Sequence, residues 1–268
     1  MIALQNRSVA GVNVELLQAG AGRPLLFLHA GDGMDWGSPL VAQLSSRFQF
    51  VAPSHPGFGK SELPPHFNQV SDLAYFYLDL IEELDLRDVL VVGCSFGAWI
   101  AMEMAVKSCE RISQLVFADA VGVKFAGREV REIADLFSLT PGELAHHVFF
   151  DSSRFTPDYS KMTPEQLAVV ARNRESFTLF GWSPTLHNPK LRQRLHRIKA
   201  PALVLWGAQD RVVSPDYGRS LAAALPKARF DLIEGAGHYP QVEQPAEFAS
   251  RVTAFAAPKL SAAGGVAR

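Results

Sequence analysis

The chain has 268 residues, of which 48% are hydrophobic and 20% charged, and its formal net charge at pH 7 is −1. These values are ordinary for a soluble globular protein and exclude a strongly basic nucleic-acid-binding chain. The densest basic segment, KLRQRLHRIK at 190–199, is expected to be a solvated helix face, so no nucleic-acid partner is expected. Because no apolar run approaches membrane-spanning length, no membrane partner is expected either.

The cysteines and the chain ends bear on location. Cys94 and Cys109 are too few for a disulfide framework and suit a reducing compartment. The N-terminus lacks the continuous apolar region of a signal peptide. We therefore predict a cytoplasmic protein. Residues 258–268 are mostly small or polar and include two glycines, and they are predicted to form a disordered tail.

Short apolar runs alternate with helical patterns along most of the chain. The first run, VNVELLQAG at 12–20, alternates polar and apolar residues and predicts a hairpin or an edge strand. Six later runs are continuous and rich in β-branched and aromatic residues, which is typical of strands covered on both faces. These runs lie at 24–30, 48–53, 88–93, 113–119, 201–207 and 228–233.

Helical patterns lie between these runs. Residues 71–84 repeat apolar side chains on one face, with Ser71 as the predicted N-cap. A later helix is predicted to begin at Pro215, with Ser214 as its N-cap, and another covers 245–255. The alternation predicts an α/β fold with a mostly parallel central sheet flanked by helices.

Residues 121–199 break this alternation, because they contain no convincing strand. Thr140 and Thr163 each begin a capping box with proline at the first helical position. The segment is also rich in aromatic side chains. We predict that 121–199 form a helical cap, inserted into a core made of residues 1–120 and 200–257.

The segment VVGCSFGAW, residues 91–99, places Ser95 between Gly93 and Gly97, where a predicted strand meets a predicted helix. In this G-x-S-x-G pattern, glycine at the flanking positions lets the strand and the helix approach closely. The strained turn presents the serine hydroxyl at the carboxyl end of the sheet, beside the positive end of the helix dipole. Ser95 is therefore a candidate nucleophile, although the pattern alone also fits a tight turn with serine as a helix cap.

A serine hydroxyl is a weak nucleophile, so it needs a base and an acid that orients the base. His238 lies in the loop EGAGHYPQVEQP after the last predicted strand, and Asp210 lies in LWGAQDRVV after the preceding strand. Both loops are expected at the carboxyl end of the sheet, as is Ser95. Asp119 also ends a predicted strand and is the alternative acid; otherwise it is a turn residue at the entrance to the cap.

The order serine, aspartate, histidine over three separate motifs resembles the α/β-hydrolase superfamily, in its group with a helical cap. The similarity runs from about residue 10 to 256. It implies a catalytic triad in which Ser95 is the nucleophile, His238 the base and Asp210 the acid. The WGxxD setting of Asp210 is where the acid of this family normally lies.

The resemblance also implies an oxyanion hole formed by the backbone N–H groups of Phe96 and of Gly31, which lies in LHAGDGMDW. Alanine replaces the usual first glycine of this loop. The backbone N–H of Ala30 is therefore an alternative to that of Gly31 as the oxyanion donor. Asp32 is expected to form a turn with the next glycine and to place its side chain in solvent. His29 is expected to be buried and to support the loop by hydrogen bonding.

The aromatic cap predicts an apolar pocket between cap and sheet, which suits a small-molecule apolar substrate. Arg154 and Arg194 are the candidates for reaching inward to a carboxylate. Because the adjacent His146 and His147 point apart on a helix, no metal is expected, and no cofactor is indicated. The candidate pocket residues are Ala30, Phe149, Trp182 and Tyr239.

Together with the resemblance, these residues predict a serine hydrolase that cleaves a small to medium, largely apolar ester, thioester or lactone through an acyl-enzyme on Ser95. One alternative is hydrolysis of a carbon–carbon bond in a vinylogous diketone, which related capped members perform with the same triad. Those members usually carry asparagine where this chain has Cys94 and tryptophan where it has Tyr239. The second alternative is a non-catalytic α/β-hydrolase-like ligand receptor.

Overall fold

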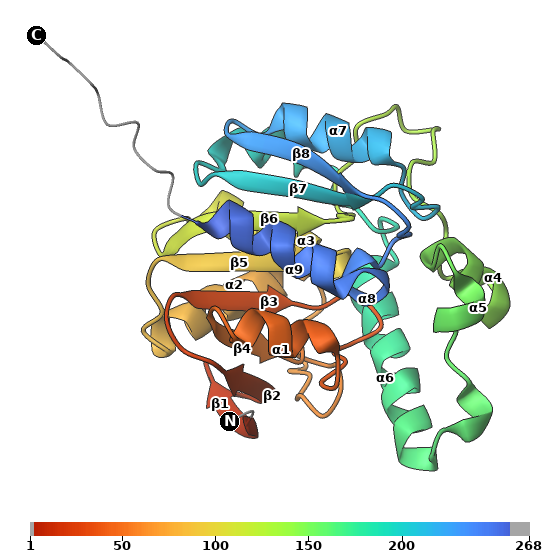
Figure 1. Cartoon of the computed structure of the whole chain (residues 1–268), viewed down its shortest axis with the longest axis horizontal. Coiled ribbons are helices and arrows are strands. Elements are labelled where there is room, and N and C mark those ends of the chain that lie inside the picture. Colours follow the sequence, from red (N-terminus) through yellow and green to blue (C-terminus); the bar gives the residue numbers. More distant parts are fainter. Residues whose placement is uncertain (1–2, 258–268) are drawn as a thin grey trace, which may run out of the picture.

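The computed structural model describes residues 3–257, within which eight strands form one sheet (Figure 1). From edge to edge the strands are β1 (Ala3–Val9), β2 (Val12–Ala19), β4 (Gln49–Pro53), β3 (Pro24–Leu28), β5 (Val89–Cys94), β6 (Ile112–Ala118), β7 (Ala202–Gly207) and β8 (Ala228–Ile233). β1 pairs antiparallel with β2, and β2 pairs antiparallel with β4, whereas the remaining pairs are parallel. The α/β fold with a mostly parallel sheet is confirmed, and the predicted tail at 258–268 lies outside the described residues.

Each of the six continuous apolar runs forms a strand whose ends lie within two residues of the prediction. The alternating run forms β2, the second arm of a hairpin that turns at Ala10 and Gly11, both with positive φ. The two edge strands are β1 and β8, and β2 is not one of them. β8 is only partly buried, so the prediction of a strand covered on both faces was wrong there, because β8 lies at the edge and pairs with β7 alone. All residues of β5 and β7 are buried, because helices cover both faces of the sheet there.

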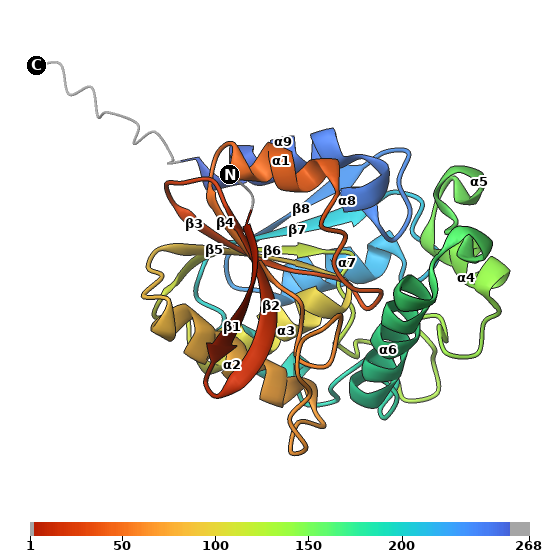
Figure 2. The same cartoon turned by 90° about the horizontal axis from the view of Figure 1, so that it is seen from below.

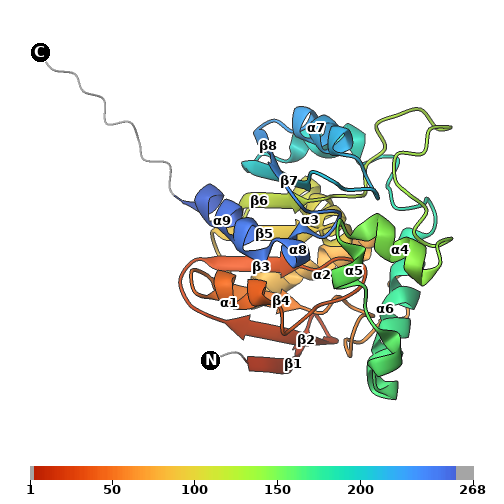
Figure 3. The ribbon, with the colours of Figure 1, turned by 45° about the vertical axis from the view of Figure 1, so that its right-hand side comes forward.

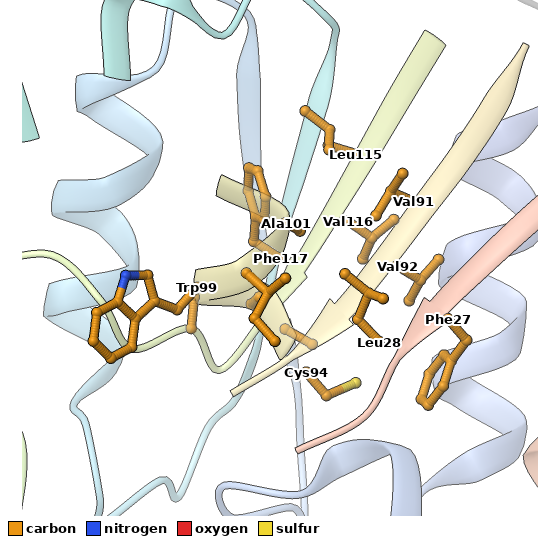
Figure 4. Close-up of a cluster of buried hydrophobic side chains, with 14 of the residues drawn as sticks. Phe27, Leu28, Val91, Val92, Cys94, Trp99, Ala101, Leu115, Val116 and Phe117 are labelled. Atoms are coloured by element: carbon orange, nitrogen blue, oxygen red, sulfur yellow. The ribbon is translucent and has the colours of Figure 1, made fainter. Parts of the chain in front are cut away.

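Helices flank the sheet on two faces (Figure 2). α1 (Pro39–Ser45) and α9 (Pro245–Ala256) lie together on one face. α2 (Val70–Glu83), α3 (Phe96–Lys107) and α7 (Pro215–Ala224) cover the other. Figure 4 shows the core between them, where side chains of β3, β5 and β6 pack beside Trp99 and Ala101 of α3.

The starts of two helices test the capping predictions. α7 begins at Pro215 after Ser214, as predicted. α2 begins at Val70, with Gln69 rather than Ser71 as its N-cap. The prediction was wrong because the Asp72 carboxylate accepts hydrogen bonds from the Asn68 and Gln69 N–H groups, which starts the helix earlier.

Residues 119–201, which connect β6 to β7 and are all described, contribute no strand to the sheet. Both capping boxes form, at Thr140 and Thr163. Figures 1 and 3 show α4, α5 and α6 gathered beyond one end of the sheet, and the role of 121–199 as a cap stays a prediction. The helices of this stretch are α4 (Pro141–Val148), α5 (Ser152–Phe155), η1 (Tyr159–Lys161), α6 (Pro164–Gly181) and η2 (Arg192–Arg197).

None of the helices within residues 3–257 combines the length and the apolar character needed to cross a bilayer.

Candidate active site

Three turns at the carboxyl ends of parallel strands bring the candidate residues together. Ser95 directly follows β5, Asp210 follows β7, and His238 follows β8. The Ser95 N–H donates to the carbonyl of Ala118 at the end of β6, 2.8 Å away, so the turn is tied to the neighbouring strand. All three side chains are buried.

Ser95 has a strained backbone, with φ 50° and ψ −110°, in a region that favours glycine. The flanking glycines allow the sharp turn. A Cβ at Gly93 would lie 2.5 Å from the Gly97 carbonyl oxygen, and one at Gly97 would overlap the carbonyl oxygen of Leu28. Ser95 is the N-cap residue of α3, yet its side chain makes no capping hydrogen bond. The hydroxyl is therefore available for another partner.

That partner is His238. The Ser95 Oγ lies 2.7 Å from His238 Nε2, and His238 Nδ1 lies 2.8 Å from Asp210 Oδ2. The Asp210 carboxylate accepts a hydrogen bond from the Nδ1–H, which keeps the proton on Nδ1 and leaves Nε2 unprotonated as an acceptor for the serine O–H. The three predicted triad residues thus form one hydrogen-bonded chain, with each group facing the partner that nucleophilic catalysis requires.

Asp210 is fixed by the turn that carries it. Its Oδ1 accepts hydrogen bonds from the N–H groups of Val212, 2.8 Å away, and Val213, 3.1 Å away. Its Oδ2 accepts from His238. Three donors therefore stabilise the ionised carboxylate inside the protein.

The His238 loop is held by residues that the sequence analysis missed. The His238 N–H donates to the carbonyl of Val148 at the end of α4, 2.7 Å away. The buried Glu243, in α8 (Pro240–Glu243), accepts from the N–H groups of Gly237, Phe150 and Asp151. One carboxylate thus ties the loop to the segment after α4. No local sequence pattern distinguishes Glu243 from a surface glutamate.

Of the two expected oxyanion donors, Phe96 directly follows Ser95, and Phe177 contacts both Phe96 and Gly31. Within the described residues, neither the Gly31 nor the Phe96 N–H donates a hydrogen bond to a protein acceptor. Phe177 of α6 covers Gly31, since a Cβ there would lie 2.7 Å from the Phe177 ring. The Phe177 ring packs edge-on against Phe96, with 5.4 Å between centroids. Phe177 was absent from the candidate pocket residues, although its helical spacing with the buried Phe180 could have signalled it.

α6 is fastened to the loops around the site. Asn173 Nδ2 donates to the Asp32 carbonyl, while its Oδ1 accepts from the Gly59 N–H. The Ser176 hydroxyl and the Arg172 guanidinium both donate to the Gly57 carbonyl. Only 2% of Ser95 is exposed, so the described state closes over the nucleophile.

A cleft of about 830 Å³ opens beside the oxyanion loop, between that loop, α6 and α8. Ala30 and Asp32 line it, and so do Trp36, Val170 and Gln241. Neither Ser95 nor His238 is among the residues that line it. The cleft therefore meets the candidate site at the oxyanion loop.

The other candidate pocket residues lie elsewhere. Tyr239 and Phe149 are buried and pack edge-on, with ring centroids 5.8 Å apart, next to His238. Trp182 is 58% exposed and packs on Phe137 outside the cleft. Phe149, Tyr239 and Trp182 do not line the cleft, whereas Ala30 does. A substrate-binding role for all four stays a prediction.

Asp32 lies at the surface of the cleft, but its carboxyl group does not point into open solvent as expected, because it interacts with the Tyr239 hydroxyl and with His238. Burial among the surrounding residues raises the pKa of Asp32 to about 6, partly offset by hydrogen bonding and by His238. The same surroundings and the charge of Asp32 hold the pKa of the Tyr239 hydroxyl well above its ordinary value. The wall of the cleft therefore carries a negative charge at neutral pH.

His29 is buried, as expected, and stacks on His55 with ring centroids 3.6 Å apart. His29 Nδ1 donates to the Ala30 carbonyl, and its Nε2 accepts from the His55 N–H. Burial lowers the pKa of His29 to about 4 and holds that of His55 well below its usual range. Both imidazoles are thus neutral supports of the oxyanion loop.

Asp119 lies in the turn directly after β6 and close to the triad residues. It is fully buried, and its carboxylate, that of Asp210 and the His238 ring lie within 4.8 Å of one another. Among residues 3–257 this is the one group whose spacing would fit a metal ion. Asp210 and His238 already use their facing atoms on each other, which fits an organic triad better than a metal site.

The strained turn leads to a stability prediction. Ser95→Gly should unfold at a higher temperature than Ser95→Ala, with a free energy of unfolding about 1 kcal/mol larger, because glycine removes the Cβ that strains positive φ. Both variants lose the hydroxyl, so each is the control for the other. Thermal unfolding of the two purified variants provides the measurement. An equal or lower melting temperature for the glycine variant would show that the turn stores no strain.

Comparisons with known proteins agree with this geometry. A model of the alpha/beta hydrolase family matches residues 25–251. A 2-hydroxy-6-oxo-2,4-heptadienoate hydrolase of Pseudomonas putida is 28% identical over 92% of this chain and 94% of its own length. A putative non-heme bromoperoxidase, BpoC, of Mycobacterium tuberculosis is 29% identical over 87% of this chain and 94% of its own.

Among solved structures, a membrane phospholipase A described as a bacterial virulence factor superposes with a TM-score of 0.79. It is 25% identical and covers 95% of this chain and 85% of its own. The family match alone spans well over half of the sequence. The chain belongs to the alpha/beta hydrolase family.

Proposed function

We propose that the protein is a serine hydrolase that cleaves a small to medium, largely apolar ester, thioester or lactone through an acyl-enzyme on Ser95. The observation that carries the proposal is the hydrogen-bonded chain from Ser95 Oγ through His238 to Asp210. His238 Nε2 removes the hydroxyl proton as Ser95 Oγ attacks the substrate carbonyl carbon. The N–H groups of Gly31 and Phe96 then stabilise the tetrahedral oxyanion.

The intermediate collapses when His238 gives the proton to the leaving oxygen or sulfur, so that the alcohol or thiol departs and the acyl group stays on Ser95. A water molecule, deprotonated by the same imidazole, then attacks the acyl carbonyl. This attack forms a second tetrahedral intermediate. When that intermediate collapses, the carboxylic acid is released and His238 returns the proton to Ser95 Oγ. Throughout, the Asp210 carboxylate stabilises the imidazolium that forms twice in each cycle.

The preference for an uncharged substrate follows from the groups around the site. Phe96 and Phe177 present apolar rings beside the oxyanion donors, and Asp32 places a carboxylate on the wall of the cleft. Arg154 and Arg194, the candidates for reaching inward, are both exposed, and Arg154 packs over the Phe155 ring, which supports a site without an arginine clamp. An acyl group that carries its own carboxylate is therefore disfavoured.

Carbon–carbon bond hydrolysis is the second candidate, and the dienoate hydrolase relative favours it. The 2-hydroxy-6-oxo-2,4-heptadienoate in the name of that relative is a carboxylate, and its keto form is a vinylogous diketone. Carbon–carbon bond hydrolysis requires a substrate of this kind. The same triad would serve, with water added to the ketone. Asp32 argues against it, because a negative wall near the oxyanion loop opposes a carboxylate substrate. A protein that turned over the dienoate but none of the esters and lactones would reverse this preference.

The nucleophile and the acid are tested by two substitutions. Ser95→Ala should reduce turnover of p-nitrophenyl esters of short acyl chains to below about one-hundredth of wild type, because the attacking oxygen is lost. Asp210→Asn should lower kcat by about four orders of magnitude, because the amide no longer holds the required histidine tautomer. Asp216→Asn, in a residue exposed on α7, is the charge-matched control and should keep wild-type activity.

Activity that survives in Ser95→Ala would remove Ser95 from the nucleophile role. Wild-type protein that binds these esters without turnover would point to a ligand receptor, the third interpretation.

The role of Asp32 is tested with a charged substrate. The p-nitrophenyl monoester of a dicarboxylic acid should react more slowly than a neutral ester of equal length, and the difference should shrink as pH falls through about 6, where Asp32 gains a proton. Asp32→Asn should raise kcat/KM for the acidic ester about tenfold at neutral pH, since about 1.4 kcal/mol of charge repulsion is removed. The neutral ester is the control. Equal effects on both esters would exclude an electrostatic role.

A further inference from the structure

Asp119 is a buried carboxyl group that the proposed mechanism does not use. It follows β6 with φ 45°, and its N–H donates to the Leu205 carbonyl of β7, 3.0 Å away. Its Oδ1 accepts from the Gly207 N–H at 2.8 Å. These bonds hold the side chain across the ends of two neighbouring strands, beside Asp210.

The second oxygen of Asp119 has no assigned donor. Oδ2 is buried and receives no hydrogen bond from any donor in the described residues. The Asp119 and Asp210 carboxyl groups and the His238 ring lie within 4.8 Å of one another. An ionised Asp119 would place a full negative charge next to another carboxylate with the Gly207 N–H as its one donor in the described residues, at a large cost in free energy.

The charges around Asp119 offer no compensation. The titratable groups that act on it are Asp210 and Glu243, while Cys94 and His238 lie close by. Burial, and then the charge of Asp210, raise the pKa of Asp119 well above its ordinary value. No lysine or arginine is among the groups that act on Asp119, and His238 becomes a cation only transiently in the proposed cycle. Two adjacent buried carboxyl groups in these surroundings share one proton rather than both ionising.

The hydrogen-bond partners decide which carboxyl group holds that proton. Asp210 accepts from two backbone N–H groups and from His238 Nδ1, so it has the partners of an anion. Asp119 accepts from one backbone N–H, its second oxygen is buried without a donor in the described residues, and its carboxyl group is within hydrogen-bonding reach of Asp210. A proton on Asp119 Oδ2 converts that oxygen into a donor and gives it the Asp210 carboxylate as acceptor.

We propose that Asp119 stays protonated through the catalytic cycle and donates its carboxylic O–H to Asp210, as a positioning residue that holds Asp210 against His238. The proposal rests on the proposed function for its catalytic consequence, but the protonation of Asp119 is independent of it. The hydrogen-bonded chain then has four members, Ser95, His238, Asp210 and Asp119, of which only the first two exchange a proton with each other and the substrate.

Asparagine is an isosteric substitute for a protonated aspartate at this position. Its amide oxygen accepts from Gly207 and its N–H donates to Asp210, so Asp119→Asn should restore most of the activity that Asp119→Ala loses. The alanine variant should lose kcat by about tenfold to hundredfold with KM little changed, which corresponds to one hydrogen bond to a charged group. The pH–rate profile of Asp119→Asn should match that of wild type.

An ionised Asp119 predicts different results. Removal of its charge would then disfavour the imidazolium of His238 and move the acid limb of the Asp119→Asn profile to lower pH, with activity as low as in the alanine variant. That outcome would overturn the proposal. Loss of a tightly bound divalent metal from Asp119→Asn, measured by elemental analysis, would overturn it in favour of a metal site.

A measurement without turnover separates this proposal from the serine hydrolase function. Infrared difference spectra of Ser95→Ala against Ser95→Ala/Asp119→Asn, recorded at pH 8, should show the carbonyl band of one protonated carboxylic acid that the second substitution removes. Absence of that band would refute a protonated Asp119. Since neither protein carries the nucleophile, the result is the same whether or not the chain hydrolyses esters.

Discussion

The hydrogen bond between Ser95 Oγ and His238 Nε2 joins positions 143 residues apart in the sequence. Its 2.7 Å length requires that the turns after β5 and β8 reach the same place above the sheet. Parallel strands make this arrangement available, because their carboxyl ends meet at one edge. The strained backbone of Ser95 lifts the hydroxyl out of the turn, and Glu243 with the end of α4 fixes the histidine loop.

Burial gives this constraint its chemical consequence. In an environment of low polarity each carboxyl group needs its own set of donors to stay ionised, and the donors are distributed unequally. Asp210 receives three, whereas Asp119 receives one, and Asp32 faces a cleft where burial raises its pKa to about 6. Three aspartates near one histidine therefore differ in charge and in role. The neutral pair His29 and His55 supports the oxyanion loop without adding a charge to the site.

The sequence was informative where local chemistry dictates geometry. The G-x-S-x-G turn, the six predicted strands and the proline-led capping boxes at Thr140 and Thr163 depend on residues near one another in the chain, and all are present. The predicted burial fails only for β8, which lies at the sheet edge. Interactions over long separations were not predictable. Glu243 binds N–H groups 92 and 93 residues away, and Phe177 covers Gly31 from a different part of the chain. Asp119 had a recognisable position at a strand end, but only the packing of β6 on β7 shows that it is fully buried beside Asp210.

Covalent trapping of the nucleophile tests the central claim most directly. Wild-type protein treated with a p-nitrophenyl alkylphosphonate should release one equivalent of p-nitrophenol and gain the mass of one phosphonyl group. Peptide mapping should place the added mass on Ser95, and Ser95→Ala should gain none. Adduct formation should be slow in Asp210→Asn, because His238 is no longer held as a base. A stoichiometric adduct on any other residue, or labelling of Ser95→Ala at the wild-type rate, would contradict the account.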